Sequence, residues 1–152
     1  DKHGRPIANR VEGGKRPRSS MAPTIVFDET GALKAVLGSP GGSRIILYVL
    51  KALVGLIDWK LDAQQAAALI NFGSRGRDFE LEFDAALTTQ AILAPWKHRP
   101  AIWHAIRMKP FGHRMRPDWM TSGLHIVVRR KGMLEGAADP RREGIAKGQS
   151  SL

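Results

Sequence analysis

Apolar residues in the first part of the chain occur in two short segments separated by a polar turn. Residues 24–27 (Thr-Ile-Val-Phe) and residues 33–37 (Leu-Lys-Ala-Val-Leu) both have the composition of strands. The sequence Asp-Glu-Thr-Gly at residues 28–31 is typical of a turn. This pattern predicts a β-hairpin with strands at residues 24–27 and 33–37.

A mostly apolar segment comes after the hairpin, beyond a turn rich in Gly and Ser at residues 38–43. From residue 43 to residue 57, apolar side chains recur at helical spacing on most sides, which is typical of a buried helix. Asp62 has the character of an N-cap and predicts a second, shorter helix that ends near Leu69. Residues 71–76 are expected to form a loop, because Gly and Ser interrupt the apolar pattern there.

Strands are predicted again in the second half of the chain. Residues 79–83 alternate between apolar and acidic side chains, so we expect a strand with one face in water. Residues 124–128 predict another strand, and a turn at residues 131–132 brings residues 133–138 back against it. We expect His125, within this strand, to be a packed residue of the core.

The ends of the chain are polar, and this sets the domain bounds. Residues 1–18 form a basic arm, residues 19–148 the main domain, and residues 149–152 a short tail. The elements of the main domain predict an α+β fold with a mostly antiparallel sheet and a buried helix after the Pro-Gly-Gly turn. The chain begins at Asp1 without the apolar core of a signal peptide, so we expect it to be a piece of a longer polypeptide.

Charge and composition narrow the possible chemistry. The chain has 152 residues, of which 24 are Lys or Arg and 14 are Asp or Glu, for a formal net charge of +10. That charge permits an anionic partner but identifies none. The sequence has no Cys, which excludes disulfide bonds, Cys-ligated zinc and thiol nucleophiles. We predict no cofactor and no membrane span, because the longest apolar segment is too short to cross a bilayer.

Residues 84–119 are the least regular part of the chain. Residues 85–93 are compatible with a helix, and four prolines interrupt the rest of the segment. Residues 97–116 contain six Lys or Arg, no acidic residue and a tryptophan. Such a segment binds single-stranded nucleic acid in some proteins; a solvated basic face with buried tryptophans is the simpler interpretation, and we favour it. His98 and His104 have no nearby carboxylate to complete a metal site, so none is predicted.

Two short motifs flank the predicted hairpin and are the candidates for chemistry. Gly41 and Gly42 precede the predicted buried helix, where free N–H groups and the helix dipole favour negative charge. Two adjacent amides directed at one point are what an oxyanion hole requires. The hydroxyls of Ser19 and Ser20, just before the first strand, could donate hydrogen bonds to a carboxylate. The alternatives are an ordinary turn and a solvated loop.

These motifs, in this order, resemble the small subunit of the gamma-glutamyltranspeptidases, also called glutathione hydrolases. The resemblance covers residues 9–82 and 112–148, while residues 84–119 diverge from the family. It rests on five main segments: Lys-Arg-Pro-Arg-Ser-Ser-Met-Ala-Pro-Thr-Ile-Val at 15–26, Gly-Ser-Pro-Gly-Gly-Ser-Arg-Ile-Ile at 38–46, Asn-Phe-Gly-Ser-Arg at 71–75, Met-Thr-Ser-Gly-Leu-His at 120–125 and Gly-Ala-Ala-Asp-Pro-Arg-Arg-Glu-Gly at 136–144.

The resemblance implies an N-terminal-nucleophile hydrolase with an αββα sandwich. Such a protein cuts its own precursor, and the new N-terminal threonine attacks the γ-glutamyl amide of glutathione. The γ-glutamyl group then passes to water or to an amino acid or peptide. By this resemblance, Ser19 and Ser20 hold the α-carboxylate of the γ-glutamyl group, and Gly41 and Gly42 supply the oxyanion hole.

The family's nucleophile is not expected within this chain. The resemblance puts it well upstream of Ser19, whereas only 18 residues precede that position. The pair Thr88-Thr89 is internal and lacks the free α-amino group that activates such a threonine. The partners implied are glutathione or another γ-glutamyl compound, the large subunit and the N-terminal part of the small subunit, with a periplasmic or extracellular location. The alternative is a truncated, non-catalytic family member that acts as a basic binding module for an anionic partner such as nucleic acid.

Overall fold

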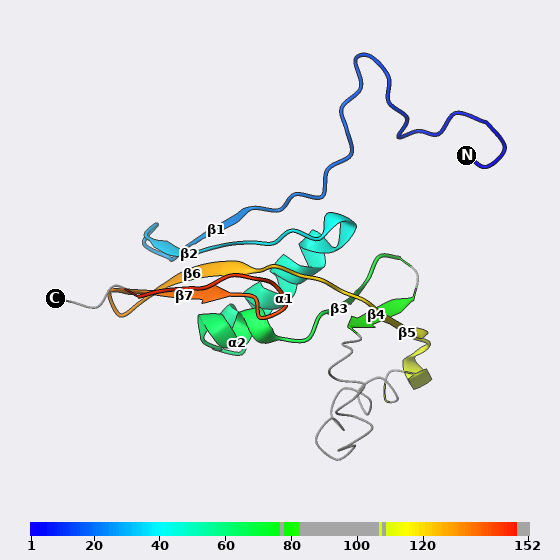
Figure 1. Ribbon diagram of the computed structural model, residues 1–152. Helices are drawn as coiled ribbons and strands as arrows, with labels where there is room; N and C mark the ends of the chain where they lie inside the picture. The colour runs from blue at the N-terminus through cyan, green and yellow to red at the C-terminus, as the bar shows by residue number, and fades with distance from the viewer. Residues whose placement is uncertain (77, 83–106, 108, 149–152) are drawn as a thin grey trace.

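The larger sheet is antiparallel and contains strands from both halves of the chain. The structure, a computed structural model, describes residues 1–76, 78–82, 107 and 109–148 (Figure 1). In these residues the sheet has the order β1-β2-β6-β7. Its strands are β1 (Thr24–Phe27), β2 (Leu33–Gly38), β6 (His125–Arg130) and β7 (Met133–Ala138).

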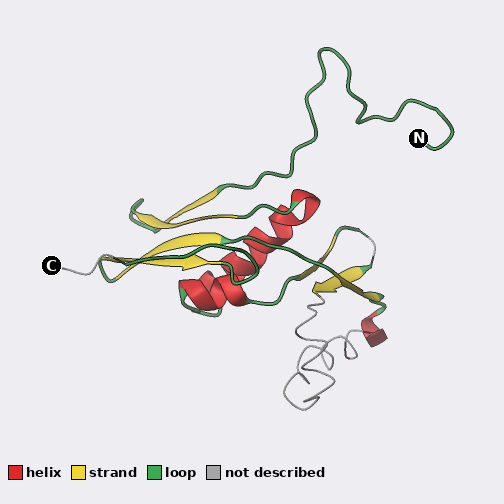
Figure 2. Ribbon diagram, viewed as in Figure 1, coloured by secondary structure: helices red, strands yellow, loops and turns green. Residues whose placement is uncertain are grey.

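Two helices pack on one face of this sheet. A short 3-10 turn, η1 (Gly42–Arg44), leads into α1 (Ile45–Ile57), and α2 (Ala63–Ala68) comes next. α1 contacts β2, and α2 contacts β6 and β7, so the helices lie alongside the sheet (Figure 2). The core between them consists of small and branched apolar side chains: Ala35, Leu37, Val49, Ala52, Ala63, Ala66, Ala67, Leu124, Ile126, Val128 and Ala137.

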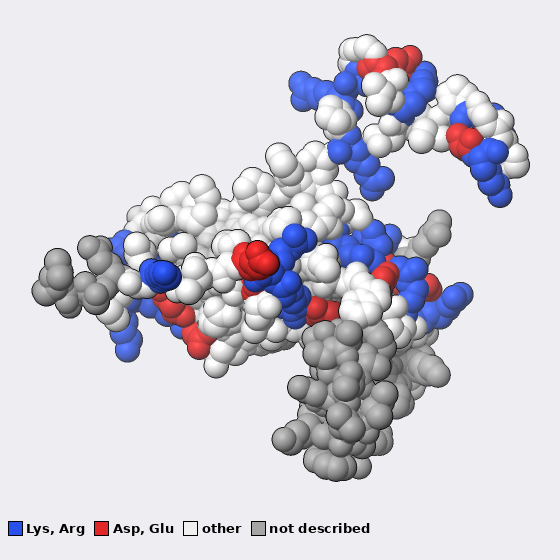
Figure 3. Space-filling model, viewed as in Figure 1, with Lys and Arg blue, Asp and Glu red and all other residues white. Residues whose placement is uncertain are grey.

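The chain also forms a smaller sheet, whose first two strands come after the helices in the sequence. It contains β3 (Phe72–Ser74), β4 (Phe79–Glu82) and β5 (Met115–Asp118), with a second 3-10 turn, η2 (Lys109–Phe111), before β5. β3 pairs antiparallel with β4, whereas β4 pairs parallel with β5. Figure 3 shows basic and acidic side chains close together at the right-hand edge of the molecule, where this sheet lies.

The face of the larger sheet opposite the helices is apolar and exposed. Ile25 pairs with Val36, and Val36 pairs with Val127, so one apolar row crosses three strands. These three side chains are 59%, 40% and 44% exposed. Phe27 lies on the same face of β1, two residues from Ile25, and is 60% exposed. Within the described part of the chain, nothing covers this second apolar face.

Several local predictions are confirmed. The hairpin forms at Thr24–Phe27 and Leu33–Gly38, and the turn at residues 131–132 joins β6 to β7. Asp62 caps α2, because its carboxylate accepts the Gln65 N–H at 2.6 Å while the Gln65 side chain accepts the Asp62 N–H. These elements depend on short-range pairing and capping, which a sequence pattern records well.

Other local predictions are wrong. The expected loop at residues 71–76 contains strand β3. The expected buried helix is only partly covered, since Ile46 and Leu50 of α1 are 56% and 53% exposed. His125 is exposed on β6, because its neighbour Ile126 occupies the core face and side chains alternate along a strand.

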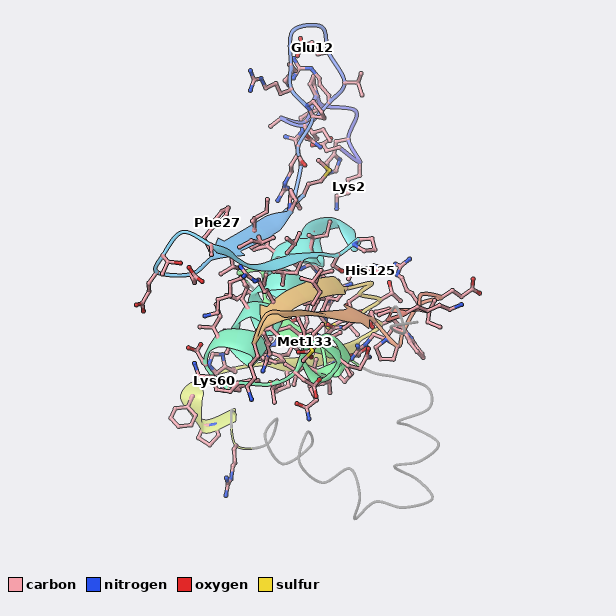
Figure 4. The ribbon with its side chains drawn as sticks, turned by 90° about the vertical axis from the view of Figure 1, so that its left-hand side faces the viewer. Lys2, Glu12, Phe27, Lys60, His125 and Met133 are labelled. Carbon is pink, nitrogen blue, oxygen red and sulfur yellow. The ribbon has the colours of Figure 1, made fainter. Side chains whose placement is uncertain are left out.

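The remaining predictions concern the ends and the least regular segment. Residues 1–18 are exposed, contain neither helix nor strand, and leave the sheet as an arm with Glu12 at its far end (Figure 4). The expected helix at residues 85–93, the pair Thr88-Thr89 and residues 97–106 lie outside the described residues. No helix in the described part of the chain is long and apolar enough to cross a membrane.

Candidate functional site

The turn between β2 and η1 contains two adjacent glycines, and its backbone requires glycine at Gly41. Gly41 has a φ of 141°, and Gly42 has a φ of 58°. A Cβ added to Gly41 would overlap the buried ring of Tyr48, whose Cδ2 lies 3.0 Å from that position. A Cβ on Gly42 would meet no atom within 4 Å, so the turn is open on that side. The backbone therefore packs on Tyr48 at one glycine and faces open space at the next.

The amides of this turn are available to a ligand. The Gly41 carbonyl accepts the Arg44 N–H at 3.2 Å, and the Gly42 carbonyl accepts the Ile45 N–H. In the described part of the chain, the N–H groups of Gly41 and Gly42 donate to no acceptor. They lie at the N-terminal end of η1 and α1, where the helix dipole favours negative charge. The turn is therefore suited to bind an anion through its main chain.

The residues before the turn are held by the loop that leads into β6. The Gly123 N–H donates to the Ser39 hydroxyl at 3.0 Å, and that hydroxyl donates to the Pro40 carbonyl at 2.7 Å. A Cβ on Gly123 would lie 2.8 Å from Cγ of Pro40, so the two segments are in close contact. This packing fixes the direction from which the chain enters the turn.

The residues after the turn are held by ion pairs. Nη1 of Arg75 lies 2.5 Å from the Ser43 hydroxyl, and Nη2 of Arg75 lies 2.5 Å from Glu80. Nε of Arg44 lies 2.8 Å from Glu80, and its Nη2 lies 2.6 Å from Asp118. Arg116 contacts both carboxylates at 2.8 Å. A cluster of three arginines and two carboxylates thus supports the start of η1.

Glu80 is the buried centre of this cluster. Its side chain is 6% exposed, yet the hydrogen bond from Arg44 and that from Arg75 together hold the pKa of its carboxyl at about 2. Glu80 in turn raises the pKa of Arg44, although burial works against that charge. Glu80 and Arg44 are therefore charged at neutral pH, and the pairing compensates the cost of burying Glu80.

The serine pair lies at the same end of the hairpin as the glycine pair. Thr24 pairs with Leu37, so the residues just before β1 and those just after β2 leave the sheet together (Figure 1). The Ser19 hydroxyl is exposed and accepts the Met21 N–H at 3.2 Å. Ser20 is half-buried, and its hydroxyl has no partner among the described residues. The structure thus brings both predicted pairs to one end of the sheet.

A second polar network, formed around Arg141 and Asp139, was also not predicted. Arg141 forms two bonds with Glu82, one of them Nη2 to Oε2 at 2.7 Å, and a third with Asp139 at 3.1 Å. Ser122 donates to Asp139 at 2.5 Å and accepts from Nδ2 of Asn71 at 2.9 Å. Burial raises the pKa of the Asp139 carboxyl, but the hydrogen bond from Ser122 and those around it outweigh this and lower it. The network joins β4 to the end of the β6–β7 pair where β6 begins and β7 ends.

The strand predicted at residues 79–83 is confirmed over Phe79–Glu82, but the expected face in water is wrong, and this explains why both networks were missed. The strand was expected to have a face in water, yet both carboxylates of β4, Glu80 and Glu82, are buried, at 5% and 9% exposure. The excess of arginine at scattered positions was the available signal, because buried carboxylates require such partners.

The basic segment forms ion pairs where the structure describes it, and Arg116 is its member in the first network. Arg114 pairs with Asp78 at 3.3 Å, and Arg116 pairs with Glu80 and Asp118. The other residues that suggested nucleic-acid binding lie mainly outside the described residues. No group of three or more His, Asp or Glu in the described ranges is arranged to hold a metal ion.

Comparisons with known proteins agree with one another. The family model described as gamma-glutamyltranspeptidase matches residues 2–149. The glutathione hydrolase proenzyme of Escherichia coli (strain K12) is 36% identical over 134 residues, which are 88% of this chain and 21% of that protein. The corresponding proenzyme of Pseudomonas sp. (strain A14) is 34% identical over 145 residues, covering 93% of this chain and 24% of that protein.

The structural comparison gives the same family. A highly active mutant of gamma-glutamyltranspeptidase from Pseudomonas nitroreducens superposes with a TM-score of 0.70 at 29% identity, over 96% of this chain and 70% of that chain. The α+β arrangement of antiparallel strands and helices is thus shared with that enzyme over about 70% of the solved chain. The chain spans about a fifth to a quarter of the length of these two curated relatives.

Proposed function

The chain belongs to the gamma-glutamyltranspeptidase family, and from this premise we propose that it is the C-terminal part of the small subunit of a glutathione hydrolase. Its length supports a part of a subunit, since it corresponds to about 70% of a solved family chain and to about a fifth of a proenzyme; the C-terminal position rests on the sequence resemblance. The order of its motifs supports it as well, because the serine pair precedes the glycine pair by one hairpin.

The single observation that supports this function best is the turn at Gly41 and Gly42. In our proposal its two free amides stabilise the oxyanion that forms when a nucleophile attacks the γ-glutamyl carbonyl. The turn is held by Tyr48 and by ion pairs, so the donors need little reorganisation during the reaction. One such donor contributes about 3 kcal/mol to transition-state stabilisation in comparable hydrolases.

The serine pair has the second role in this proposal. The hydroxyls of Ser19 and Ser20 donate to the α-carboxylate of the γ-glutamyl group and so place its γ-carbonyl near the turn. Both serines lie at the end of the hairpin where the turn lies, and the Ser20 hydroxyl has no partner among the described residues. The substrate class is therefore glutathione or another γ-glutamyl amide.

The nucleophile comes from outside this chain in our proposal. An N-terminal threonine, produced by processing upstream, attacks the γ-carbonyl; the amine then leaves, and water or an acceptor amine releases the γ-glutamyl group. The apolar outer face of the larger sheet supports the need for further polypeptide, since a face of this kind packs against another layer in folded proteins. The second sheet of an αββα sandwich would provide that layer, in a periplasmic or extracellular enzyme.

The test is to recover the coding sequence upstream of Asp1 and to express the whole polypeptide. We expect it to cleave itself once, to give a smaller product that begins with Thr and contains this chain, and to hydrolyse a γ-glutamyl anilide. A polypeptide that neither cleaves itself nor hydrolyses this substrate contradicts the proposal. Salt-dependent retention of that inactive polypeptide on a nucleic-acid column would favour the binding-module alternative.

A further inference from the structure

We propose that Arg75 is a positioning residue for the oxyanion donors, acting on Gly42 through the hydroxyl of Ser43. This inference rests on the proposed function, because it assigns a role in the reaction to a residue that would not touch the substrate. Its evidence is the set of contacts that fix the Arg75 guanidinium, together with the conformational freedom of Gly42.

The guanidinium of Arg75 is fixed by Glu80. Its Nη2 lies 2.5 Å from Oε1 of Glu80, and the other oxygen of that carboxylate accepts Nε of Arg44 at 2.8 Å. Because the side chain of Glu80 is 6% exposed and held on both oxygens, it has little freedom to move. A guanidinium is planar, so fixing one of its edges also fixes the direction of the other.

The other edge of Arg75 meets the turn. Its Nη1 lies 2.5 Å from the hydroxyl of Ser43, the residue directly after Gly42. Gly42 itself has a φ of 58°, and among the described residues no atom beyond Gly42 and its chain neighbours lies within 4 Å of the position of a Cβ there. The orientation of the Gly42 amide therefore depends on its neighbours along the chain, Gly41 on Tyr48 and Ser43 on Arg75.

The consequence concerns the transition state more than the bound substrate. The charge on the γ-carbonyl oxygen develops only during the reaction, so a misdirected Gly42 amide lowers kcat. Binding of the γ-glutamyl carboxylate depends on the serine pair in the proposed function, so the KM is expected to change little. A lower kcat with a nearly unchanged KM therefore distinguishes a positioning role from a general loss of structure.

The experiment uses the complete self-processed enzyme and its hydrolysis of a γ-glutamyl anilide. We expect Arg75→Gln to lower kcat about 10- to 100-fold, which does not exceed the loss of kcat caused by removing one oxyanion donor. The KM is expected to stay within about twofold of the wild-type value. Ser43→Ala is expected to lower kcat similarly, and the double variant to be no slower than Arg75→Gln alone, because both changes remove the same contact. Arg75→Lys is expected to restore part of kcat.

Arg114 provides the matched control. It directly precedes β5, and among the described residues its side chain pairs with Asp78 at 3.3 Å rather than with Glu80 or the turn, so Arg114→Gln is expected to leave kcat unchanged. An Arg75→Gln enzyme with wild-type kcat overturns the inference, as does a double variant in which the two losses multiply. If Arg75→Gln blocks processing, Ser43→Ala alone decides, by the same kcat and KM criteria.

A second measurement separates this inference from the proposed function. Hydrogen exchange at the amides of residues 42–44 is expected to be faster in Arg75→Gln than in wild type or Arg114→Gln. A wild-type protein without hydrolytic activity contradicts the proposed function, whether or not this exchange changes. Unchanged exchange in an active Arg75→Gln enzyme contradicts the positioning role alone.

Discussion

Gly41 and Gly42 are adjacent, yet a side chain would meet different surroundings at each. At Gly41 a Cβ overlaps the Tyr48 ring, whereas at Gly42 it enters open space. We therefore expect Gly41→Ala to displace the turn, to cost about 1–3 kcal/mol of stability from overpacking and to abolish most turnover. Gly42→Ala has only the left-handed φ to oppose it, about 1–2 kcal/mol.

The two variants are compared by thermal unfolding and by kcat for a γ-glutamyl anilide in the complete enzyme. Gly42→Ala serves as the control, because it adds the same methyl group one residue later. Equal losses of stability and turnover at the two positions would show that contact with Tyr48 does not define the turn.

Lys51 is a buried cation whose charge opposes folding. Only 3% of the residue is exposed, and its Nζ donates to the Leu69 carbonyl, which also accepts Arg141 at 2.9 Å. Burial, with a further contribution from the Arg141 charge, lowers the pKa of Lys51 from 10.5 to about 7, against the smaller opposite effect of Asp139 and Glu82. The folded protein therefore binds the Lys51 proton less tightly than the unfolded chain does.

This difference predicts a dependence of stability on pH. Between pH 7 and pH 10.5 the unfolded chain holds the proton and the folded protein does not, so stability rises with pH, by at most about 1.4 kcal/mol per pH unit. Lys51→Met removes the effect. We expect its thermal midpoint to exceed that of wild type at pH 7 and below, and the difference to shrink toward pH 10.

Lys34→Met, at an exposed position of β2, is the control for loss of one positive charge. The difference in thermal midpoint between Lys34→Met and wild type should not shrink in this way toward pH 10. A Lys51→Met protein whose advantage is constant from pH 6 to pH 10 would mean that Lys51 keeps its proton in the folded state.

At the scale of elements, β4 shows why buried charge is difficult to predict from sequence. The alternation at residues 79–82 identifies a strand, but it does not say which of the two faces is buried. Here the acidic face is buried, because arginines from other elements reach it: Arg44 from η1, Arg75 from the β3–β4 loop, Arg116 from β5 and Arg141 after β7. The partners are separated from β4 by up to 59 residues.

The difference between contacts that are local in sequence and contacts that are distant in sequence also explains which other parts of the fold were predicted. The hairpin at residues 24–38 and the cap at Asp62 depend on neighbours in sequence and were predicted. The local alternation marked β4 of the smaller sheet. β3 is only three residues long, and β5 is more than thirty residues further along the chain than β4, so no local pattern marked these two strands. Within the site, glycine and hydroxyl motifs pointed to both pairs. Arg75 ends the segment at 71–75 that contributes to the family resemblance, but no pattern assigned a role to Arg75 or to Glu80.

The pairing of Arg141 with Glu82 leads to a prediction at this scale. Their side chains are 18% and 7% exposed, and Asp139, the third member, is 1% exposed. Arg141→Met leaves two buried carboxylates without their cation, which is expected to destabilise the fold by about 3–5 kcal/mol. Adding Glu82→Met to Arg141→Met removes one of these charges and should restore part of the loss.

Thermal unfolding of wild type and the two variants at neutral pH measures this. Arg142→Met is a suitable control, because Arg142 bonds to the carbonyls of Thr121 and Ser122 rather than to a carboxylate. If the double variant is less stable than Arg141→Met, then Glu82 stabilises the fold through other contacts, such as the Asn71 N–H at 2.8 Å.

For the whole molecule, the distribution of apolar surface is more informative than the charge. Some of the basic residues behind the net charge of +10 lie on the exposed arm, while arginines at the small sheet are paired with carboxylates and add no net charge there. By contrast, the row formed by Ile25, Val36 and Val127 is continuous and has no partner in the described residues. Exposed apolar patches of this kind mark interaction surfaces.

Among the described residues the larger sheet has a helical layer on one face only, so under the proposed function its outer face should associate with the upstream polypeptide. We expect separately expressed upstream sequence to bind this chain and to protect it from a hydrophobic dye. Val36→Lys with Val127→Lys should greatly weaken that binding, because two cations would be buried in an apolar interface. Lys34→Gln, on the same strand but outside the apolar row, should bind as the wild type does. If the double lysine variant binds normally, the outer face is open to solvent in the complete protein, and the second layer must lie elsewhere.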